Sequence, residues 1–154
     1  DYREYDLDLL MEEKWSQMEK FASESVDVIE GSIDLIKRLS DANYSLAVAS
    51  ASNLNYVNSV LRTLGVKNYF SYIVSGDMVS KGKPNPESFL LASSKINVPS
   101  EYCLVIEDGV SGMQAAQTGG MKCIGLVKNI NKTYPTKNLV TSLSEITQDY
   151  INQI

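Results

Sequence analysis

The spacing of apolar and polar positions divides the chain into short strands that alternate with helices. Apolar runs at residues 44–50, 70–75, 102–107 and 121–127 are short and predict buried strands. Between them, residues 53–64 and 87–97 repeat apolar positions three or four apart, which predicts helices. Gly65 is expected to end the first of these helices, and Asn85-Pro86 to begin the second. Strands that alternate with helices predict an α/β fold with a parallel sheet.

The beginning of the chain has a different pattern. Residues 7–21 space their apolar side chains as an amphipathic helix does, and residues 22–30 lose that period. A second helix is expected after Gly31, and residues 143–153 are expected to close the chain with a helix. We therefore interpret residues 1–24 as a separate helical region and residues 25–154 as the α/β body.

Polar side chains gather where the predicted strands end. Residues 50–53 (Ser-Ala-Ser-Asn) follow the first strand, the loop with Lys83 follows the second, and Glu107 and Asp108 follow the third. In an open parallel sheet, ligands bind at these carboxyl ends. Each feature alone has a structural explanation: a helix cap at Ser50 or Ser52, a solvated lysine, or acidic residues before a helix. Their coincidence at one sheet edge favours a functional site.

Composition narrows the chemistry. The chain has 154 residues, a formal charge of −5, and no histidine, which excludes Ser-His-Asp, Cys-His and histidine-zinc sites within it. A net negative chain is a poor nucleic-acid binder, and no apolar run reaches the roughly 20 residues of a membrane helix. No secretory signal is visible. Cys103 and Cys123 both fall in predicted strands, and we expect reduced thiols in a cytoplasmic protein.

Three segments together resemble a known family. VASAS at 48–52, GKPNPE at 82–87 and VIEDGVSGMQAA at 105–116 resemble the second, third and fourth motifs of the haloacid dehalogenase-like hydrolases, most closely the β-phosphoglucomutase-like branch. The resemblance covers about residues 30–130 and implies a three-layer, Rossmann-like core. Catalysis would be phosphoryl transfer with Mg²⁺, acting on a small phosphorylated metabolite.

The resemblance also implies roles for individual residues. Ser50 is the phosphate-binding hydroxyl, aided by the backbone N–H of Ala51, and Lys83 offsets charge on the phosphoryl group. Asp108 is the magnesium ligand, with Glu107 beside it as a direct or water-mediated second carboxylate. Residues 52–53 (Ser52 and Asn53) would contact the distal part of the substrate. Hard carboxylate oxygens suit Mg²⁺, and phosphoryl transfer needs such charge stabilisation.

One motif of the family is absent from its expected context. The first motif is a buried strand that ends in Asp-x-Asp, which holds the nucleophile and the acid/base. Asp6-Leu7-Asp8 is the one Asp-x-Asp here, but no apolar strand precedes it, so we interpret it as the acidic start of a helix. The first helix resembles the end of a helical cap. We therefore expect a C-terminal part of a larger hydrolase, inactive alone, whose partner is the N-terminal remainder.

Some questions stay open at this stage. The sequence does not separate phosphatase from phosphomutase, and it leaves the substrate and the oligomeric state undetermined. The alternatives are a naturally short non-catalytic relative, a flavodoxin-like or receiver-like binding module, and a subunit that completes a sheet with another chain.

The resemblance makes one further prediction about the sheet. The first-motif strand would lie between residues 44–50 and 102–107, so these two strands should not pair, and a slot about 10 Å wide should separate them. A retained N-terminal fragment, a second chain, or direct pairing of the two strands are the ways to fill that slot.

Overall fold

The computed structural model describes residues 7–154, with side chains from residue 9 onward. The helices are α1 (Leu7–Glu24), α2 (Ser32–Asp41), α3 (Leu54–Thr63), α4 (Glu87–Lys95), α5 (Val110–Thr118) and α6 (Gln148–Asn152). The strands are β1 (Leu46–Ala49), β2 (Phe70–Val74), β3 (Leu104–Glu107), β4 (Lys122–Leu126) and β5 (Asn138–Val140). Short 3₁₀ turns cover Lys67–Tyr69, Gly76–Met78, Ser100–Tyr102 and Leu143–Glu145.

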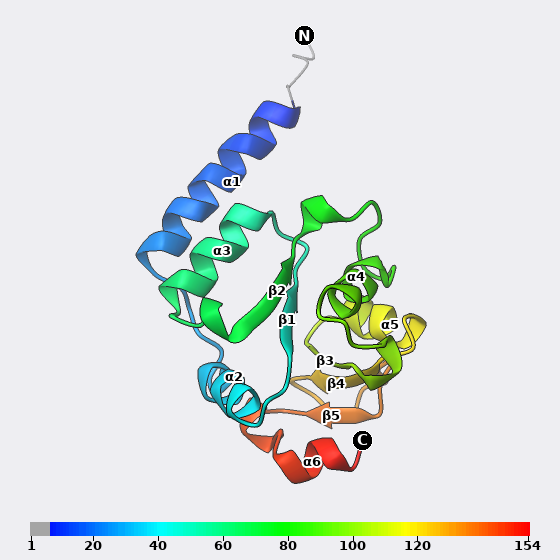
Figure 1. Cartoon of the computed structure of the whole chain (residues 1–154). Coiled ribbons are helices and arrows are strands. Elements are labelled where there is room, and N and C mark those ends of the chain that lie inside the picture. Colours follow the sequence, from blue (N-terminus) through cyan, green and yellow to red (C-terminus); the bar gives the residue numbers. More distant parts are fainter. Residues whose placement is uncertain (1–6) are drawn as a thin grey trace.

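The strands form two separate sheets (Figure 1). β1 pairs with β2, and β3, β4 and β5 follow one another in the second sheet; every pairing is parallel. The α/β fold class with parallel strands is therefore confirmed. Within residues 7–154, β1 and β3 do not pair. The prediction that these two strands are not neighbours is confirmed, and direct pairing is ruled out as the way the slot closes.

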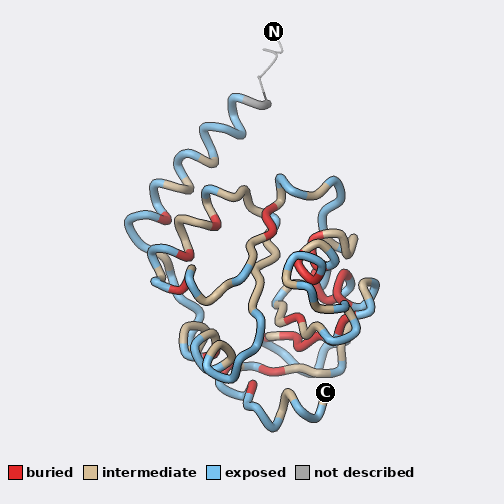
Figure 2. Tube along the Cα trace, viewed as in Figure 1, coloured by how far each residue is buried: buried red, intermediate tan, exposed pale blue. Residues whose placement is uncertain are grey.

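Three apolar clusters form the core. The cluster of α4, α5 and β4 includes Phe89 and Met113, and the cluster below the second sheet includes Leu35 and Ile124. A third cluster packs α3 against the first sheet around Val57. Buried residues are concentrated in these clusters, whereas β1 is only half-buried along its whole length (Figure 2). The expectation of a fully buried first strand is wrong, because one of its edges has no neighbouring strand.

Element boundaries differ from the sequence prediction in instructive places. β5 was not predicted; its three residues are too few for a periodic signal. The expected closing helix is divided into the 3₁₀ turn at Leu143–Glu145 and α6. Cys103 lies just before β3 and not inside it. Pro86, not Asn85, is the cap position of α4, although the Asn85 side chain still accepts the Glu87 N–H at 3.0 Å.

Helix α1 lies alongside α3 and extends beyond the body (Figure 1). Thr63 Oγ1 donates to the carbonyl of Ala22 at 2.7 Å, and the rings of Trp15 and Tyr56 lie 6.0 Å apart. The division of the chain into a helical region (residues 1–24) and an α/β body (residues 25–154) stays a prediction. Asp6 lies outside the described residues, as does the side chain of Asp8, so the interpretation of that acidic pair is not tested. No helix in the described part of the chain is long and apolar enough to cross a membrane.

Candidate active site

Lys83 is fixed by three different contacts at the carboxyl ends of two strands. Its ammonium lies 2.7 Å from Glu107 Oε2 and donates to the carbonyl of Ala49 at 3.4 Å. The same nitrogen lies 4.6 Å from the centre of the Phe89 ring. Glu107 ends β3 and Ala49 ends β1, so Lys83 joins the ends of two strands that do not pair. These contacts rule out the alternative explanation of Lys83 as a solvated loop lysine.

Glu107 is more strongly engaged than an ordinary strand-end carboxylate. Besides Lys83, it accepts the backbone N–H groups of Asp108 at 3.2 Å and Gly109 at 3.0 Å. Burial raises the pKa of Glu107, but the hydrogen bonds and the positive charge of Lys83 outweigh burial and hold that pKa below its usual 4.5. Glu107 is therefore an ionised, fully hydrogen-bonded anchor for Lys83.

Gly112 makes room for this carboxylate, and our sequence reasoning missed it. A Cβ atom added at Gly112 would overlap the carboxyl group of Glu107. Gly112 lies in the first turn of α5, and a glycine inside a helix is normally destabilising. Its presence there is explained by the close approach of the Glu107 carboxyl group. That position, four residues after Asp108, is the signal that could have identified it.

The turn after β1 is organised by its own polar side chains. Ser50 Oγ accepts the backbone N–H of Ser52 at 3.1 Å, and Asn53 Oδ1 accepts the N–H of Tyr56 at 2.9 Å as the cap of α3. The alternative structural explanation, in which Ser50 or Ser52 caps this helix, is ruled out because Asn53 is the cap. Ala51 is exposed, and Ser50, Ser52 and Asn53 are half-buried. Their assignment to phosphate or substrate stays a prediction.

The turns after β1 and β2 are locked together. Gly76 N–H donates to the carbonyl of Ser52 at 2.8 Å, and a Cβ at Gly76 would overlap the backbone of Ala51. The two turns can approach this closely only because residue 76 is a glycine. The contact fixes the position of the backbone of residues 50–53 relative to β2. Gly76 is thus a second positioning residue that the sequence pattern did not reveal.

Glu87 holds the loop that carries Lys83. Its carboxylate accepts the backbone N–H groups of Ser80 and Lys81, both at 2.9 Å, and the Ser80 hydroxyl. These hydrogen bonds outweigh a smaller opposing effect of burial and lower the pKa of Glu87. Because Glu87 begins α4, the loop is tied to the same helix whose Phe89 contacts Lys83.

Asp108 faces a different space from Glu107. Asp108 is exposed and lines a cavity of about 370 Å³ with Glu30, Lys128 and Ser142, whereas Glu107 lines the larger cavity between the sheets. The carboxylate oxygens of Asp108 are hard ligands of the kind that Mg²⁺ prefers. The oxygens of Glu107 are already bonded, so Glu107 fits a water-mediated role better than a direct one. Among residues 9–154, no three acidic, cysteine or histidine side chains assemble into a metal cage.

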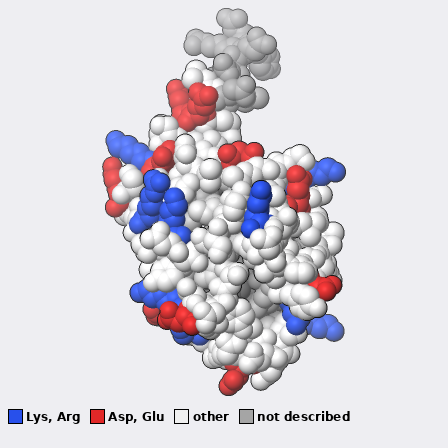
Figure 3. Space-filling view, in the orientation of Figure 1, with Lys and Arg blue, Asp and Glu red and all other residues white. Residues whose placement is uncertain are grey.

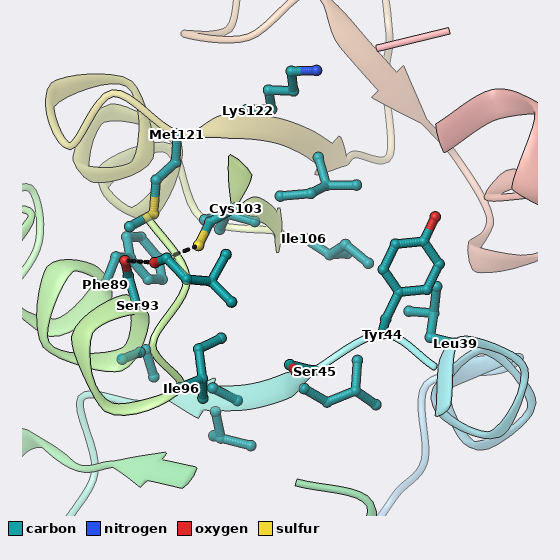
Figure 4. A pocket seen from close by; sticks show the side chains of 18 of the residues that line it. Leu39, Tyr44, Ser45, Phe89, Ser93, Ile96, Cys103, Ile106, Met121 and Lys122 are labelled. Carbon is teal, nitrogen blue, oxygen red and sulfur yellow. Dashed lines mark hydrogen bonds between the residues drawn. The ribbon is translucent and has the colours of Figure 1, made fainter. Parts of the chain in front are cut away.

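Between the two sheets lies a cavity of about 660 Å³ (Figure 4). The four residues of β1 and the four residues of β3 line opposite sides of it. Phe89 of α4, Ile96 at the C-cap of that helix, and Leu39 of α2 line its sides (Figure 4). Lys83 lies at the carboxyl end of both lining strands. The predicted slot is therefore present as an apolar groove.

The fold and this strand-end arrangement define an α/β protein with a polar site at the carboxyl ends of parallel strands, and comparison with known proteins identifies its family. A profile described as haloacid dehalogenase-like hydrolase matches residues 2–126. The chain belongs to this family. The relatives compared include phosphatases and a β-phosphoglucomutase.

Individual relatives agree with the family assignment. Over 98 residues the chain is 34% identical to validoxylamine A 7'-phosphate phosphatase of Streptomyces hygroscopicus subsp. limoneus, covering 64% of this chain and 46% of that protein. The crystal structure of CbbY from Rhodobacter sphaeroides in complex with phosphate superposes with a TM-score of 0.84 at 26% identity, over 99% of this chain and 71% of that one. β-Phosphoglucomutase from Clostridium difficile gives 0.76 at 28% identity, over 90% and 60%.

These likenesses support the β-phosphoglucomutase-like branch. The chain spans 11–46% of the length of the curated relatives compared. The activity, substrates and partners of a whole protein are therefore a matter for proposal.

Proposed function

We propose that this chain forms part of a Mg²⁺-dependent enzyme that removes or transfers the phosphoryl group of a small phosphorylated metabolite. The observation that carries the proposal is the 2.7 Å pair of Lys83 and Glu107 at the carboxyl ends of β1 and β3. The family supports phosphatase chemistry, and the pair supplies a fixed positive charge at the sheet edge where ligands bind.

The residues of this chain have separable tasks. Lys83 presents a positive charge that stabilises the oxygens of a phosphoryl group during transfer. Ser50 and the N–H of Ala51 supply hydrogen-bond donors, and Ser52 and Asn53 contact the remainder of the substrate. Rotation of the Ser50 hydroxyl allows it to accept the Ser52 N–H and donate to a phosphate oxygen at once.

Asp108 is proposed as the metal ligand that this chain contributes, with Glu107 acting through water. When bound, Mg²⁺ neutralises negative charge on the phosphoryl oxygens. Residues 9–154 assemble no cluster of three acidic, cysteine or histidine side chains. The remaining ligands would be water molecules, phosphoryl oxygens or side chains from outside the described residues.

The nucleophile is proposed to come from the N-terminal remainder of the same protein. Glu107 is a poor nucleophile because its oxygens are held by an ammonium and two backbone N–H groups. A carboxylate supplied by that remainder would replace some of these hydrogen bonds and would lie beside Lys83 at the end of the groove. On this proposal the 154-residue chain alone has no turnover, and its two free cysteines fit a reducing, cytoplasmic setting.

The test uses the longer protein with its N-terminal part and a panel of phosphomonoesters. We expect phosphate release that depends on Mg²⁺ and stops in EDTA, a strong loss in Asp108→Asn, and full activity in Glu101→Gln, an exposed carboxylate elsewhere. Equal activity in EDTA and Mg²⁺ would contradict the proposal. A panel that includes a sugar 1-phosphate, read for both phosphate and isomerised sugar phosphate, separates phosphatase from phosphomutase.

A further inference from the structure

Lys83 lies on an exposed loop that has little burial to hold it in place. Residues 80–82 and Pro84 are exposed, and the side chain of Lys83 is covered except for 19% of its surface. Apolar packing therefore contributes little to the position of this loop. The loop backbone must be fixed by hydrogen bonds if the Lys83 ammonium is to stay at the ends of β1 and β3.

A hydrogen-bonded turn carries Lys83 and is attached to the beginning of α4. The N–H of Asn85 donates to the carbonyl of Gly82 at 3.0 Å and closes a β-turn in which Lys83 is the second residue. Asn85 Oδ1 in turn accepts the N–H of Glu87 at 3.0 Å. The C-terminal end of the loop is therefore fixed to the first residue of the helix.

The side chain of Glu87 fixes the other end of the same loop. Its Oε1 accepts the N–H of Ser80 and its Oε2 accepts the N–H of Lys81, both at 2.9 Å. The Ser80 hydroxyl lies 3.1 Å and 3.0 Å from the same two oxygens. Because one N–H group bonds to each oxygen, both acceptor oxygens of a carboxylate are needed. Glu87 thus holds the loop at both ends, through its own N–H and through its carboxylate.

Glu87 acts on the loop backbone and not on the Lys83 ammonium. Among the described residues, the ion pair of Lys83 is with Glu107. Glu87 is therefore not the counter-ion of Lys83. The same helix carries Phe89, whose ring centre lies 4.6 Å from the Lys83 nitrogen. Helix α4 consequently fixes the backbone of the loop at Glu87 and contacts the ammonium at Phe89.

We infer that Glu87 is a positioning residue for Lys83: its carboxylate holds the loop so that the ammonium stays where a phosphoryl group would bind. The consequence for catalysis rests on the proposed function, whereas the effect on Lys83 is measured without any reaction of substrate. The expected consequence is large, because a misplacement of about 1 Å in a catalytic group can cost about 100-fold in rate.

The direct test measures how fast acetic anhydride acetylates Lys83 in the folded 154-residue chain, with peptide mass spectrometry as the readout. Glu87→Gln keeps the shape of the side chain but leaves one acceptor oxygen for two N–H groups. Loss of one hydrogen bond should increase opening of the loop, and with it the acetylation rate of Lys83, by about fivefold or more. Lys81, already exposed in the same loop, should keep its rate. An unchanged rate at Lys83 in folded Glu87→Gln would overturn the inference.

Glu145 provides a matched control. Its carboxylate also accepts two adjacent backbone N–H groups, those of Thr141 and Ser142, both at 2.8 Å, and the Thr141 hydroxyl at 2.9 Å. Glu145→Gln removes the same kind of contact from a loop that does not carry Lys83, so we expect the acetylation rate of Lys83 to stay unchanged. An equal increase in both variants would show general loosening of the structure and would overturn the inference.

Ser80→Ala is a milder variant that keeps the inference testable if Glu87→Gln fails to fold. Ser80 is exposed, and the change removes the hydroxyl from the Glu87 carboxylate while the backbone N–H remains. We expect the acetylation rate of Lys83 to rise by about twofold. No rise in this variant would also overturn the inference.

Turnover of the longer protein separates this inference from the proposed function. If both hold, Glu87→Gln should lower the turnover number by about tenfold or more. It should cause no further loss in a Lys83→Met background, because a residue that acts through Lys83 has nothing to position once Lys83 is removed. A further loss of equal size in that background would overturn the positioning role. Faster acetylation of Lys83 in Glu87→Gln, with no phosphatase activity in the natural protein, would support the positioning role and contradict the proposed function alone.

Discussion

The carboxyl group of Glu107 lies against the Cα atom of Gly112, in the space that a side chain at that position would fill. Glu107 reaches this space from the end of β3, and Gly112 lies in the first turn of α5. Because Glu107 also holds Lys83, a helical glycine indirectly sets the position of the cation at the sheet edge.

Gly112→Ala should therefore displace Glu107 and separate it from Lys83. We expect a loss of about 1–3 kcal/mol in the free energy of unfolding, as for overpacking elsewhere. Chemical denaturation measures it. Gly82→Ala is the control: no atom lies within 4 Å of its added Cβ, so its stability should be equal or higher. Equal stability of Gly112→Ala and the natural chain would contradict this packing.

The Lys83–Glu107 pair should make stability depend on pH in the acid range. The folded-state pKa of Glu107 lies below its usual 4.5, so its contribution is present above about pH 4.5 and is lost as pH falls through the folded-state pKa. Glu107→Gln should cost about 1–3 kcal/mol at pH 7 and progressively less at lower pH. Denaturation from pH 7 to 3 measures this, with Glu101→Gln as control. A loss that stays constant with pH would contradict the ion pair.

Two buried serines of α4 offer a matched comparison. Ser93 Oγ donates to the carbonyl of Val98, whereas Ser88 Oγ has no hydrogen-bond partner within the described structure. Ser93→Ala should lower stability by about 1 kcal/mol or more, while Ser88→Ala should be neutral or stabilising. Thermal or chemical denaturation of both variants measures this difference in stability. An equal loss in both would show that Ser88 has a partner after all.

Docking of α1 should be visible in the fluorescence of Trp15, the chain's one tryptophan. Thr63→Val removes the hydrogen bond to Ala22, and Trp15 should lose part of its packing against Tyr56. We expect red-shifted emission with little change in the global unfolding midpoint. Thr133→Val, at an exposed loop residue, serves as control. Unchanged emission in Thr63→Val would mean that other contacts hold the helix.

The two thiols should differ in reactivity although both are free. Burial, followed by the negative charge of Glu107, raises the pKa of Cys123 to about 11, so its reactive thiolate is scarce near neutral pH. Cys103 is half-buried beside the groove. Native titration with a thiol reagent should label Cys103 first, and denatured protein should show two thiols. Cys103→Ser identifies the fast site, and simultaneous labelling of both would contradict the burial of Cys123.

Local periodicity predicted the four longer strands and most helices because each buries a repeating apolar face. The resemblance to the family, through its missing first motif, correctly predicted that β1 and β3 do not pair. β5 and the interruption between Leu143 and Gln148 were not predicted, since such short elements depend on contacts distant in sequence. The site was predicted in part: Lys83 and Glu107 do meet. Gly76, Gly112 and Glu87 were missed, because their importance lies in what approaches them in space.

The face shown in Figure 3 gives no sign of a nucleic-acid partner. On the face shown in Figure 3, acidic and basic side chains are scattered among uncharged residues, with no continuous basic stripe. The weak prospect for nucleic-acid binding drawn from the net charge stays a prediction.

The division into two sheets has a consequence for cooperativity. Within the described residues no strand hydrogen bond links β1–β2 to β3–β4–β5, and α4 packs on β1, β2 and α5, thereby bridging the halves. Each half can open without breaking a strand pair in the other, so the halves should behave as distinct foldons with different opening free energies. Denaturant should then produce a broadened transition with a shallow slope. A strand seated between the sheets would convert two weakly coupled units into one that unfolds all or none.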